Sequence, residues 1–289
     1  MSLVLSTLFL AASVAPCAPP PGWTDAASQA LGGALIFGET HGTKEAPAVF
    51  AEVVCAAEAV AGPVLVALEI SHDEEPALLE AWAAPPERFE AELENALAMW
   101  RLPTQDGRSS AAMLAMFKRL HALKQEGRDI DLVAFNRGSS QRDLFLDRPA
   151  QEPHESVQAM NIAEASAKRP YAMTLVLVGN IHARKAPMGE GANAWRPMAM
   201  ILSVSMPVVS LNKSSPAGTS WSCGLKPGAT YTPGKPISND DIQCGPMDSS
   251  GSGREGPARI ELSDEQAGYD GFFHLESKTA SPPAFADQE

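Results

Sequence analysis

Acidic and imidazole side chains recur at the ends of short apolar segments in this chain of 289 residues. Glu39 and His41 follow the segment LIFG, Glu69 interrupts the run VLVALEI, and His182 lies in GNIHA. An imidazole held by a carboxylate can take a proton from water near neutral pH, and the same side chains bind divalent metals. The residue types predict acid–base hydrolysis or a metal site, and their spacing does not distinguish the two.

Each of these side chains lies where a predicted strand ends. Five strands alternate with helices, an order typical of βαβ units and a mainly parallel sheet. Because the carboxyl ends of parallel strands share one edge, where ligand sites collect, the four side chains are predicted to form one pocket. The strands are Ala34 to Phe37, Val64 to Ile70, Ile130 to Phe135, Thr174 to Val178 and Met206 to Leu211; the helices are Ala46 to Ala61, Glu74 to Trp82, Pro86 to Trp100, Ser109 to Glu126 and His154 to Lys168.

Further polar residues near this edge are candidates for substrate binding. They are Glu45, Arg108, Asn136, Arg137 and Asn180. Glu45 stands near a helix start, where a carboxylate also favours the helix dipole, so both roles stay open. The two arginines either clamp a substrate carboxylate or neutralise a buried glutamate, and neutralisation is favoured. The remaining histidines are interpreted as surface or packing residues: His72, His121, His154 and His274.

Several of these segments together resemble a known superfamily. GETHGTKE, the embedded ALE and GNIHA are similar to motifs of the superfamily that contains erythromycin esterases, ChaN-like haem-uptake proteins and Tiki/TraB-type metalloproteases. QAMNI resembles the helix that precedes its second histidine motif. The likeness covers roughly Leu35 to Lys185. It implies an α/β core with a site built from Glu39, His41, Glu69 and His182.

The resemblance implies a different chemistry for each branch. In the esterase branch the first-motif histidine is a general base that activates water, a role that would fall on His41. In the protease branch the paired motifs hold a divalent metal, which here would bind Glu39, His41, Glu69 and His182. We expect hydrolysis of an ester or amide bond in a small molecule or peptide, with a divalent metal favoured over haem as cofactor. The alternative is a haem- or metal-binding uptake protein without turnover.

Charge and composition limit the partners and the domain organisation. A net charge of -13 repels phosphate backbones, so nucleic-acid binding is not expected. No segment after the N-terminal region has the length and apolarity of a membrane span. One α/β domain is expected over 24–289, with its core at about 31–211. A helical insertion is expected beside the sheet. An irregular extension rich in Gly, Pro and Ser is expected over about 212–289; short antiparallel strands within it are left open, and it ends in a strand at Tyr269 to Glu276.

The N-terminal residues predict export. Leu3 to Ala15 form an apolar run that ends in small residues, which suits a signal peptide over residues 1–18. We expect a periplasmic or secreted protein. Lipid anchoring through Cys17 is disfavoured because Pro16 stands where a lipoprotein cleavage site needs a small non-proline residue.

Export permits disulfides, and one is predicted. Cys223 and Cys244 lie in the loop-rich extension, where a bridge would stabilise the fold by roughly 3 kcal/mol. Cys55 is interpreted as a small buried hydrophobe in a helix, and the pairing of Cys17 is left open.

Overall fold

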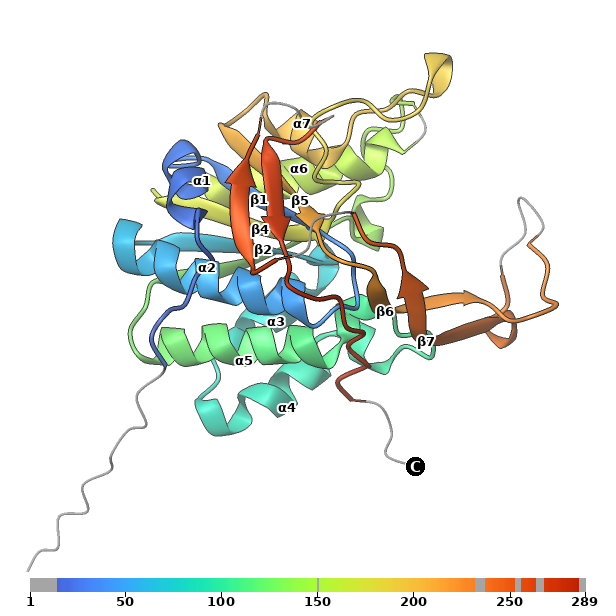
Figure 1. Ribbon diagram of the computed structural model, residues 1–289, viewed down its shortest axis with the longest axis horizontal. Helices are drawn as coiled ribbons and strands as arrows, with labels where there is room; N and C mark the ends of the chain where they lie inside the picture. Colours follow the sequence, from blue (N-terminus) through green and yellow to red (C-terminus); the bar gives the residue numbers. More distant parts are fainter. Residues whose placement is uncertain (1–14, 150, 232–236, 253–255, 264–267, 286–289) are drawn as a thin grey trace, which may run out of the picture.

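The structure is a computed structural model that describes residues 15–149, 151–231, 237–252, 256–263 and 268–285. Most of the predicted leader lies outside these residues. A seven-stranded sheet with the order β3-β2-β4-β1-β5-β9-β8 forms the centre (Figure 1). Its strands are β1 (Ala34–Glu39), β2 (Val64–Ser71), β3 (Ile130–Asn136), β4 (Met173–Gly179), β5 (Val208–Ser214), β8 (Arg259–Leu262) and β9 (Gly271–His274).

The pairing confirms a mainly parallel sheet. Neighbouring strands are parallel throughout, except that β8 is antiparallel to β9. Strands β1 to β5 and β9 match the six predicted strands, whereas β8 was not predicted. All carboxyl ends of β1 to β5 meet at one edge, which is the arrangement that the predicted pocket requires.

Helices cover both faces of the sheet, as Figure 1 shows. One face carries α1 to α5 and the other carries α6 and α7. The short helices α1 and α7 were not predicted, and α3 and α4 form the expected insertion between β2 and β3. The bounds are α1 (Trp23–Gln29), α2 (Glu45–Ala61), α3 (Glu75–Trp82), α4 (Pro86–Ala96), α5 (Ala111–Gln125), α6 (Glu152–Ser166) and α7 (Met198–Leu202).

One predicted helix is shorter than expected. The helix predicted to reach Trp100 ends at Ala96, because Leu97 has an extended backbone with φ of -112° and ψ of 120°. A short 3-10 turn, Ala98–Arg101, follows. Helix α5 begins as predicted, since the Ser110 hydroxyl accepts a hydrogen bond from the Met113 N–H.

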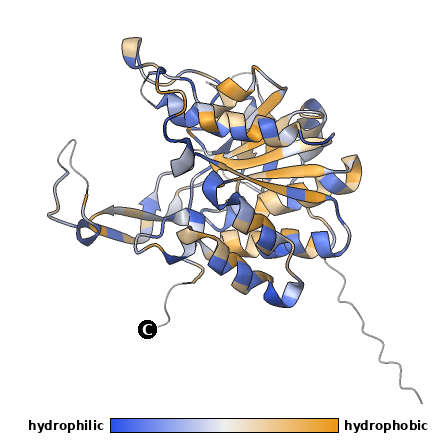
Figure 2. Cartoon of the chain, turned by 180° about the vertical axis from the view of Figure 1, so that it is seen from behind, coloured by the Kyte–Doolittle hydropathy of each residue, from blue (hydrophilic) through white to orange (hydrophobic). Residues whose placement is uncertain are grey.

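Side chains of β1 point alternately to the two faces of the sheet and contribute to the apolar core on each face. Leu35 and Phe37 pack toward α2, while Ile36 packs toward α6. The Phe37 ring meets those of Phe50 and Phe273 edge to face, with centroids 5.5 and 5.3 Å apart. Figure 2 accordingly shows apolar strands in the middle and polar residues outside. Within the described residues, no helix combines the length and apolarity that crossing a membrane requires.

The C-terminal extension contains the antiparallel strands that the sequence left open. It contains an antiparallel hairpin of β6 (Gly218–Leu225) and β7 (Ile242–Ser249), which projects from the body of the protein (Figure 1). Cys223 lies directly opposite Cys244, and the two form a disulfide with Cα atoms 4.0 Å apart. The predicted bridge is confirmed.

A second disulfide corrects the interpretation of Cys55. This residue is bonded to Cys17, with Cα atoms 5.6 Å apart, and ties the segment before α1 to helix α2. Cys55 is buried as expected, but as half of a cross-link and not as a free thiol. Two disulfides indicate an oxidising environment, in agreement with the expectation of export.

Candidate functional site

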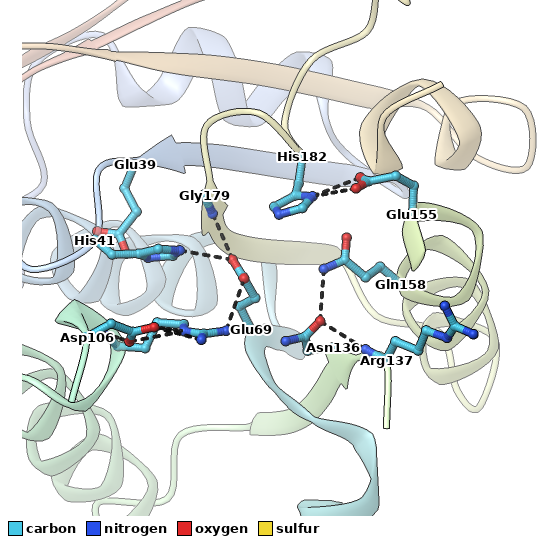
Figure 3. Close-up of polar contacts among 11 residues, drawn as sticks. Glu39, His41, Glu69, Asp106, Asn136, Arg137, Glu155, Gln158, Gly179 and His182 are labelled. Carbon is cyan, nitrogen blue, oxygen red and sulfur yellow. Dashed lines mark hydrogen bonds and ion pairs between the residues drawn. The ribbon is translucent and has the colours of Figure 1, made fainter. Parts of the chain in front are cut away.

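Two carboxylates hold His41 between them (Figure 3). Its Nδ1 donates to Oε1 of Glu39 over 2.9 Å, and its Nε2 lies 3.3 Å from Oε2 of Glu69. Burial alone would lower the pKa of His41, but the charge of Glu69 and hydrogen bonds to both glutamates raise this pKa to about 10. Because ionised carboxylates only accept hydrogen bonds, both ring nitrogens carry protons. His41 is therefore an imidazolium at neutral pH.

A β-bulge directs Glu69 into the site. The register of β2 on β3 shifts between Leu68 and Ser71, and such irregularities turn a side chain toward a new direction. One oxygen of Glu69 accepts the Gly179 N–H over 2.9 Å, and the other lies 3.5 Å from Nη1 of Arg108. Burial would raise the pKa of this carboxyl, yet His41 and Arg108 hold it well below its usual range.

Arg108 has the neutralising role that the sequence favoured. Its guanidinium forms a 2.7 Å ion pair with Asp106 in addition to its contact with Glu69. Asp106 also accepts the backbone N–H of Arg108, which fixes the short turn that carries both residues. The arginine is committed to two carboxylates of the protein.

A second histidine–carboxylate pair lies across from the first. Nδ1 of His182 lies 2.9 and 2.8 Å from the two oxygens of Glu155, a fully buried residue in the first turn of α6. Glu155 also accepts the N–H of Met198 over 2.9 Å. Burial would lower the pKa of His182, but Glu155 raises it above its ordinary value. Within the described part of the chain, Nε2 of His182 has no hydrogen-bond partner.

Gly179 brings the two pairs together. A Cβ atom at this position would lie 3.1 Å from Nε2 of His41, 3.5 Å from Cδ2 of His182 and 3.6 Å from Oε2 of Glu69. Both rings therefore rest against one glycine at the end of β4, and a larger residue would push them apart. The four predicted residues are brought to one place.

The two histidines line one wall of a cleft of about 640 Å³. Strand β6 also lines this cleft, through Ser220, Trp221, Ser222 and Cys223. The volume lies within the range of small-molecule sites. The hairpin that the sequence left as an irregular extension thus completes the cleft, and its disulfide lies at the cleft wall.

Two predicted substrate-binding residues lie elsewhere. Glu45 accepts hydrogen bonds from the Ser277 hydroxyl and the Thr279 N–H, so it anchors the C-terminal segment onto α2. The Arg137 side chain donates to backbone carbonyls of the following loop and extends away from the two histidines (Figure 3).

Asn136 and Asn180 border the site in different ways. The Asn136 side-chain oxygen accepts the Arg137 N–H over 3.0 Å and an amide N–H of Gln158 over 3.2 Å, which joins β3 to α6. Asn180 lines the cleft, and its backbone N–H donates to the carbonyl of Glu39 over 2.9 Å. Asn180 therefore fixes the end of β1 beside β4.

The expectation for His154 was wrong. Its ring lies beside that of His182, with centroids 5.7 Å apart, and burial lowers its pKa. Glu155 was not predicted at all. Both residues stand on α6 and reach the site only because that helix packs across the end of β4, so no strand-end pattern marks them. The other three histidines lie outside the cleft lining: His72 donates to the Ala134 carbonyl, His121 stacks on Phe89, and His274 is buried.

The metal ligand set implied by the resemblance does not fit the donors. Both nitrogens of His41 contact carboxylates, and Glu69 is occupied by an arginine and a backbone N–H. A different group is better placed, since His154, Glu155 and His182 each offer a ligand atom, all within 4.8 Å of one another. The buried Oε1 of neighbouring Gln158 has no partner among the described residues. A divalent ion held there would polarise water or a carbonyl oxygen.

No protein-family model matches this sequence, and no curated protein is detectably similar to it. Solved structures, in contrast, match its fold. An erythromycin esterase in its open conformation has a TM-score of 0.59 at 10% identity, covering 91% of this chain and 94% of that chain. A succinoglycan biosynthesis protein has a TM-score of 0.58 at 12% identity, covering 90% and 91%. ChaN of Campylobacter jejuni, with heme, has a TM-score of 0.43 at 12% identity, covering 77% and 89%.

These likenesses define the class of the chain at the level of fold. It is an α/β protein whose polar cleft lies at the carboxyl edge of a parallel sheet. Its fold is similar to those of the erythromycin esterase and the succinoglycan biosynthesis protein, which agrees with the fold that the motifs around Glu39, Glu69 and His182 predict.

Proposed function

We propose that the protein is an exported hydrolase that cleaves an ester or amide bond in the cleft between His41 and His182. The observation that carries the proposal is that the two imidazoles differ in the number of carboxylates they contact. His41 contacts a carboxylate at each nitrogen, whereas His182 contacts one carboxylate and keeps Nε2 without a partner in the described chain. In this proposal the cleft holds an imidazolium at His41 and, once His182 has lost its Nε2 proton, an imidazole lone pair at His182.

In this proposal His182 is the general base. Glu155 accepts the proton of Nδ1, which fixes the tautomer that leaves the lone pair on Nε2 and stabilises the cation after proton transfer. Water placed at Nε2 loses its proton to the ring and attacks the carbonyl carbon. When the tetrahedral intermediate collapses, the C–O or C–N bond to the leaving group breaks, and His182 returns the proton to the departing alcohol or amine. The role assigned to His41 by resemblance passes to the second histidine, because His41 has no lone pair to offer.

In this proposal His41 supplies the positive charge and the shared proton that stabilise the transition state. Its positive charge, maintained by Glu39 and Glu69, stabilises the oxyanion that forms when water attacks. The contact of Nε2 with Glu69 is 3.3 Å, longer than the 2.9 Å bond from Nδ1 to Glu39. The Nε2 proton is therefore the one that a substrate oxygen can share.

Export is part of the proposal. The leader predicted over residues 1–18 lies mostly outside the described residues, and Cys17 forms a disulfide. Because a cleaved leader cannot contribute half of this bridge, we place the end of the leader before Cys17. Mass spectrometry of the protein purified from the culture medium or periplasm gives the mature N-terminus directly.

Hydrolysis is tested with a panel of 4-nitrophenyl esters and acyl-peptide amides. The wild type and His182→Gln are compared before and after dialysis against a chelator. We expect the wild type to hydrolyse at least one substrate and His182→Gln to lose on the order of 10³-fold in rate. Dialysis against the chelator should leave the wild-type rate unchanged, because His182 and not a metal activates the water. Equal rates in the two proteins would remove His182 from the mechanism. Loss of wild-type activity that a divalent ion restores would transfer water activation to a metal at His154, Glu155 and His182.

The sequence-based alternative of haem uptake without turnover stays a prediction. Adding haem to the purified protein and recording the visible spectrum tests it. Unchanged haem bands would remove this alternative.

A further inference from the structure

Among the described residues, Lys213 is the charged side chain of the cleft lining that forms no ion pair and no side-chain hydrogen bond. The others that line the cleft are paired: Glu39 with His41, Asp106 with Arg108, and His182 with Glu155. Across the described residues, no carboxylate lies within ion-pair distance of the Lys213 ammonium and no hydrogen bond to it is formed.

The position of Lys213 follows from the sheet. Gly38 of β1 pairs with Asn212 of β5, so Lys213 stands one residue further along, level with Glu39 at the carboxyl edge. Its side chain is half-buried. An ammonium withdrawn from water without a partner is costly, which makes a purely structural lysine an unfavourable choice at this position.

The surroundings add positive charge. Burial and the charge of Lys278 lower the pKa of Lys213, with Glu39 opposing the shift. Lys278 is itself buried and directs its ammonium to the Ser249 hydroxyl and the Ser250 carbonyl, so it does not take an acidic partner from the cleft. In a protein of net charge -13, these two lysines create a local region that attracts a small anion.

A hydrogen-bond donor is available at the same cleft. Thr40 lines it, and its hydroxyl is buried without a partner among the described residues. We propose that Lys213, assisted by Thr40, binds a carboxylate group of the substrate and thereby orients the scissile bond toward His182. The proposal rests on the proposed hydrolase and names its substrate class, which is an ester or amide that carries a free carboxylate.

A carboxylate suits this position better than a phosphate. The Lys213 ammonium balances a single negative charge, and the Thr40 hydroxyl adds a hydrogen bond. Glu39 and Asp106 in the same lining would repel the second negative charge of a phosphate. Trp221 of β6 also lines the cleft, and its indole N–H donates to the Gln105 carbonyl. The ring of Trp221 then offers an apolar surface for the rest of the substrate.

Two matched esters test the assignment through turnover. Mono-4-nitrophenyl succinate carries a free carboxylate and 4-nitrophenyl acetate does not. We expect the wild type to prefer the succinate ester by at least about tenfold in kcat/KM, a preference that falls as ionic strength rises. Lys213→Gln abolishes the preference and Lys213→Arg retains it. The control Lys226→Gln, which changes an exposed lysine on the hairpin, leaves it intact.

Calorimetry tests the same site without turnover. Succinate is titrated into the wild type and the three variants, with neutral succinamide and inorganic phosphate as comparison ligands. Succinate should bind the wild type, Lys213→Arg and Lys226→Gln, and should lose affinity at least about tenfold in Lys213→Gln. If no ester is hydrolysed while this binding pattern holds, the hydrolase fails and the carboxylate site stands.

Other outcomes overturn the carboxylate site. Equal succinate affinity in the wild type and Lys213→Gln would do so, as would tighter binding of phosphate than of succinate. A lower melting temperature of Lys213→Gln with unchanged ester preference would show that Lys213 is only a counter-charge for Glu39.

Discussion

The two histidines of the cleft have similar neighbours but differ in how many carboxylates they contact. His41 is held by two, Glu39 and Glu69, and its pKa rises to about 10. His182 is held by one, Glu155, which also accepts the N–H of Met198. In the proposed mechanism this difference makes His41 a fixed cation and His182 the base. The sequence resemblance, in contrast, assigned the role of base to His41.

The strongest test of this difference replaces each histidine by glutamine. His182→Gln removes the base and should lower kcat on the order of 10³-fold, while His41→Gln removes a stabilising charge and should cost on the order of 10²-fold. Steady-state kinetics with the best ester of the panel measures both. His72→Gln is the control, because His72 bonds the Ala134 carbonyl and does not line the cleft. A larger loss at His41 than at His182 would reverse the assigned roles.

Glu155→Gln separates positioning from proton transfer. The variant keeps the size of the side chain but removes the charge that raises the His182 pKa. We expect kcat to fall on the order of 10²-fold, and the rising limb of the pH–rate profile to move to lower pH. A rising limb that does not move would mean that His182 is not the titrating base.

Gly179→Ala perturbs both pairs at once. The added methyl group would lie 3.1 Å from Nε2 of His41, so one or both rings must shift. A misplacement of this kind should lower kcat roughly ten- to hundredfold, with little change in melting temperature. Gly245→Ala on the hairpin is a matched control, because an added Cβ there meets no atom within 4 Å. Full activity of Gly179→Ala would show that the two rings need not be held together.

The smallest expected effect is in the pH profile of the unmodified protein. Activity should increase with pH as His182 loses its proton, with a midpoint above the ordinary value of about 6.5 because Glu155 raises the His182 pKa. It should decrease again near pH 10, where His41 loses its charge. A flat profile across this range would contradict the two proton states.

The fold could be predicted because its signals are local. Short apolar strands alternating with helical segments indicated the parallel sheet, and the polar residues at the ends of β1, β2 and β4 indicated the edge that carries the site. The Cys223–Cys244 bridge was also predictable, since both residues lie in one loop-rich stretch.

The remaining features depend on contacts between distant segments. Glu155 lies in the first turn of α6, where an acidic residue is ordinary, and only the packing of α6 on α7 buries it against His182. Strand β6 is held beside the cleft by a hydrogen bond from the backbone N–H of Trp221 to the Gly42 carbonyl. No periodicity in the sequence indicates this contact. The Cys17–Cys55 pairing likewise joins segments whose proximity the sequence does not indicate.

The central claim is that His41 is a cation and His182 is the base, and the ring nitrogens report this directly. Protein labelled with nitrogen-15 on histidine, compared with His41→Gln and His182→Gln for assignment, gives the protonation of each ring by NMR as the pH is raised. Both nitrogens of His41 should stay protonated until near pH 10, while His182 becomes neutral at lower pH. A neutral His41 ring at neutral pH would contradict the account.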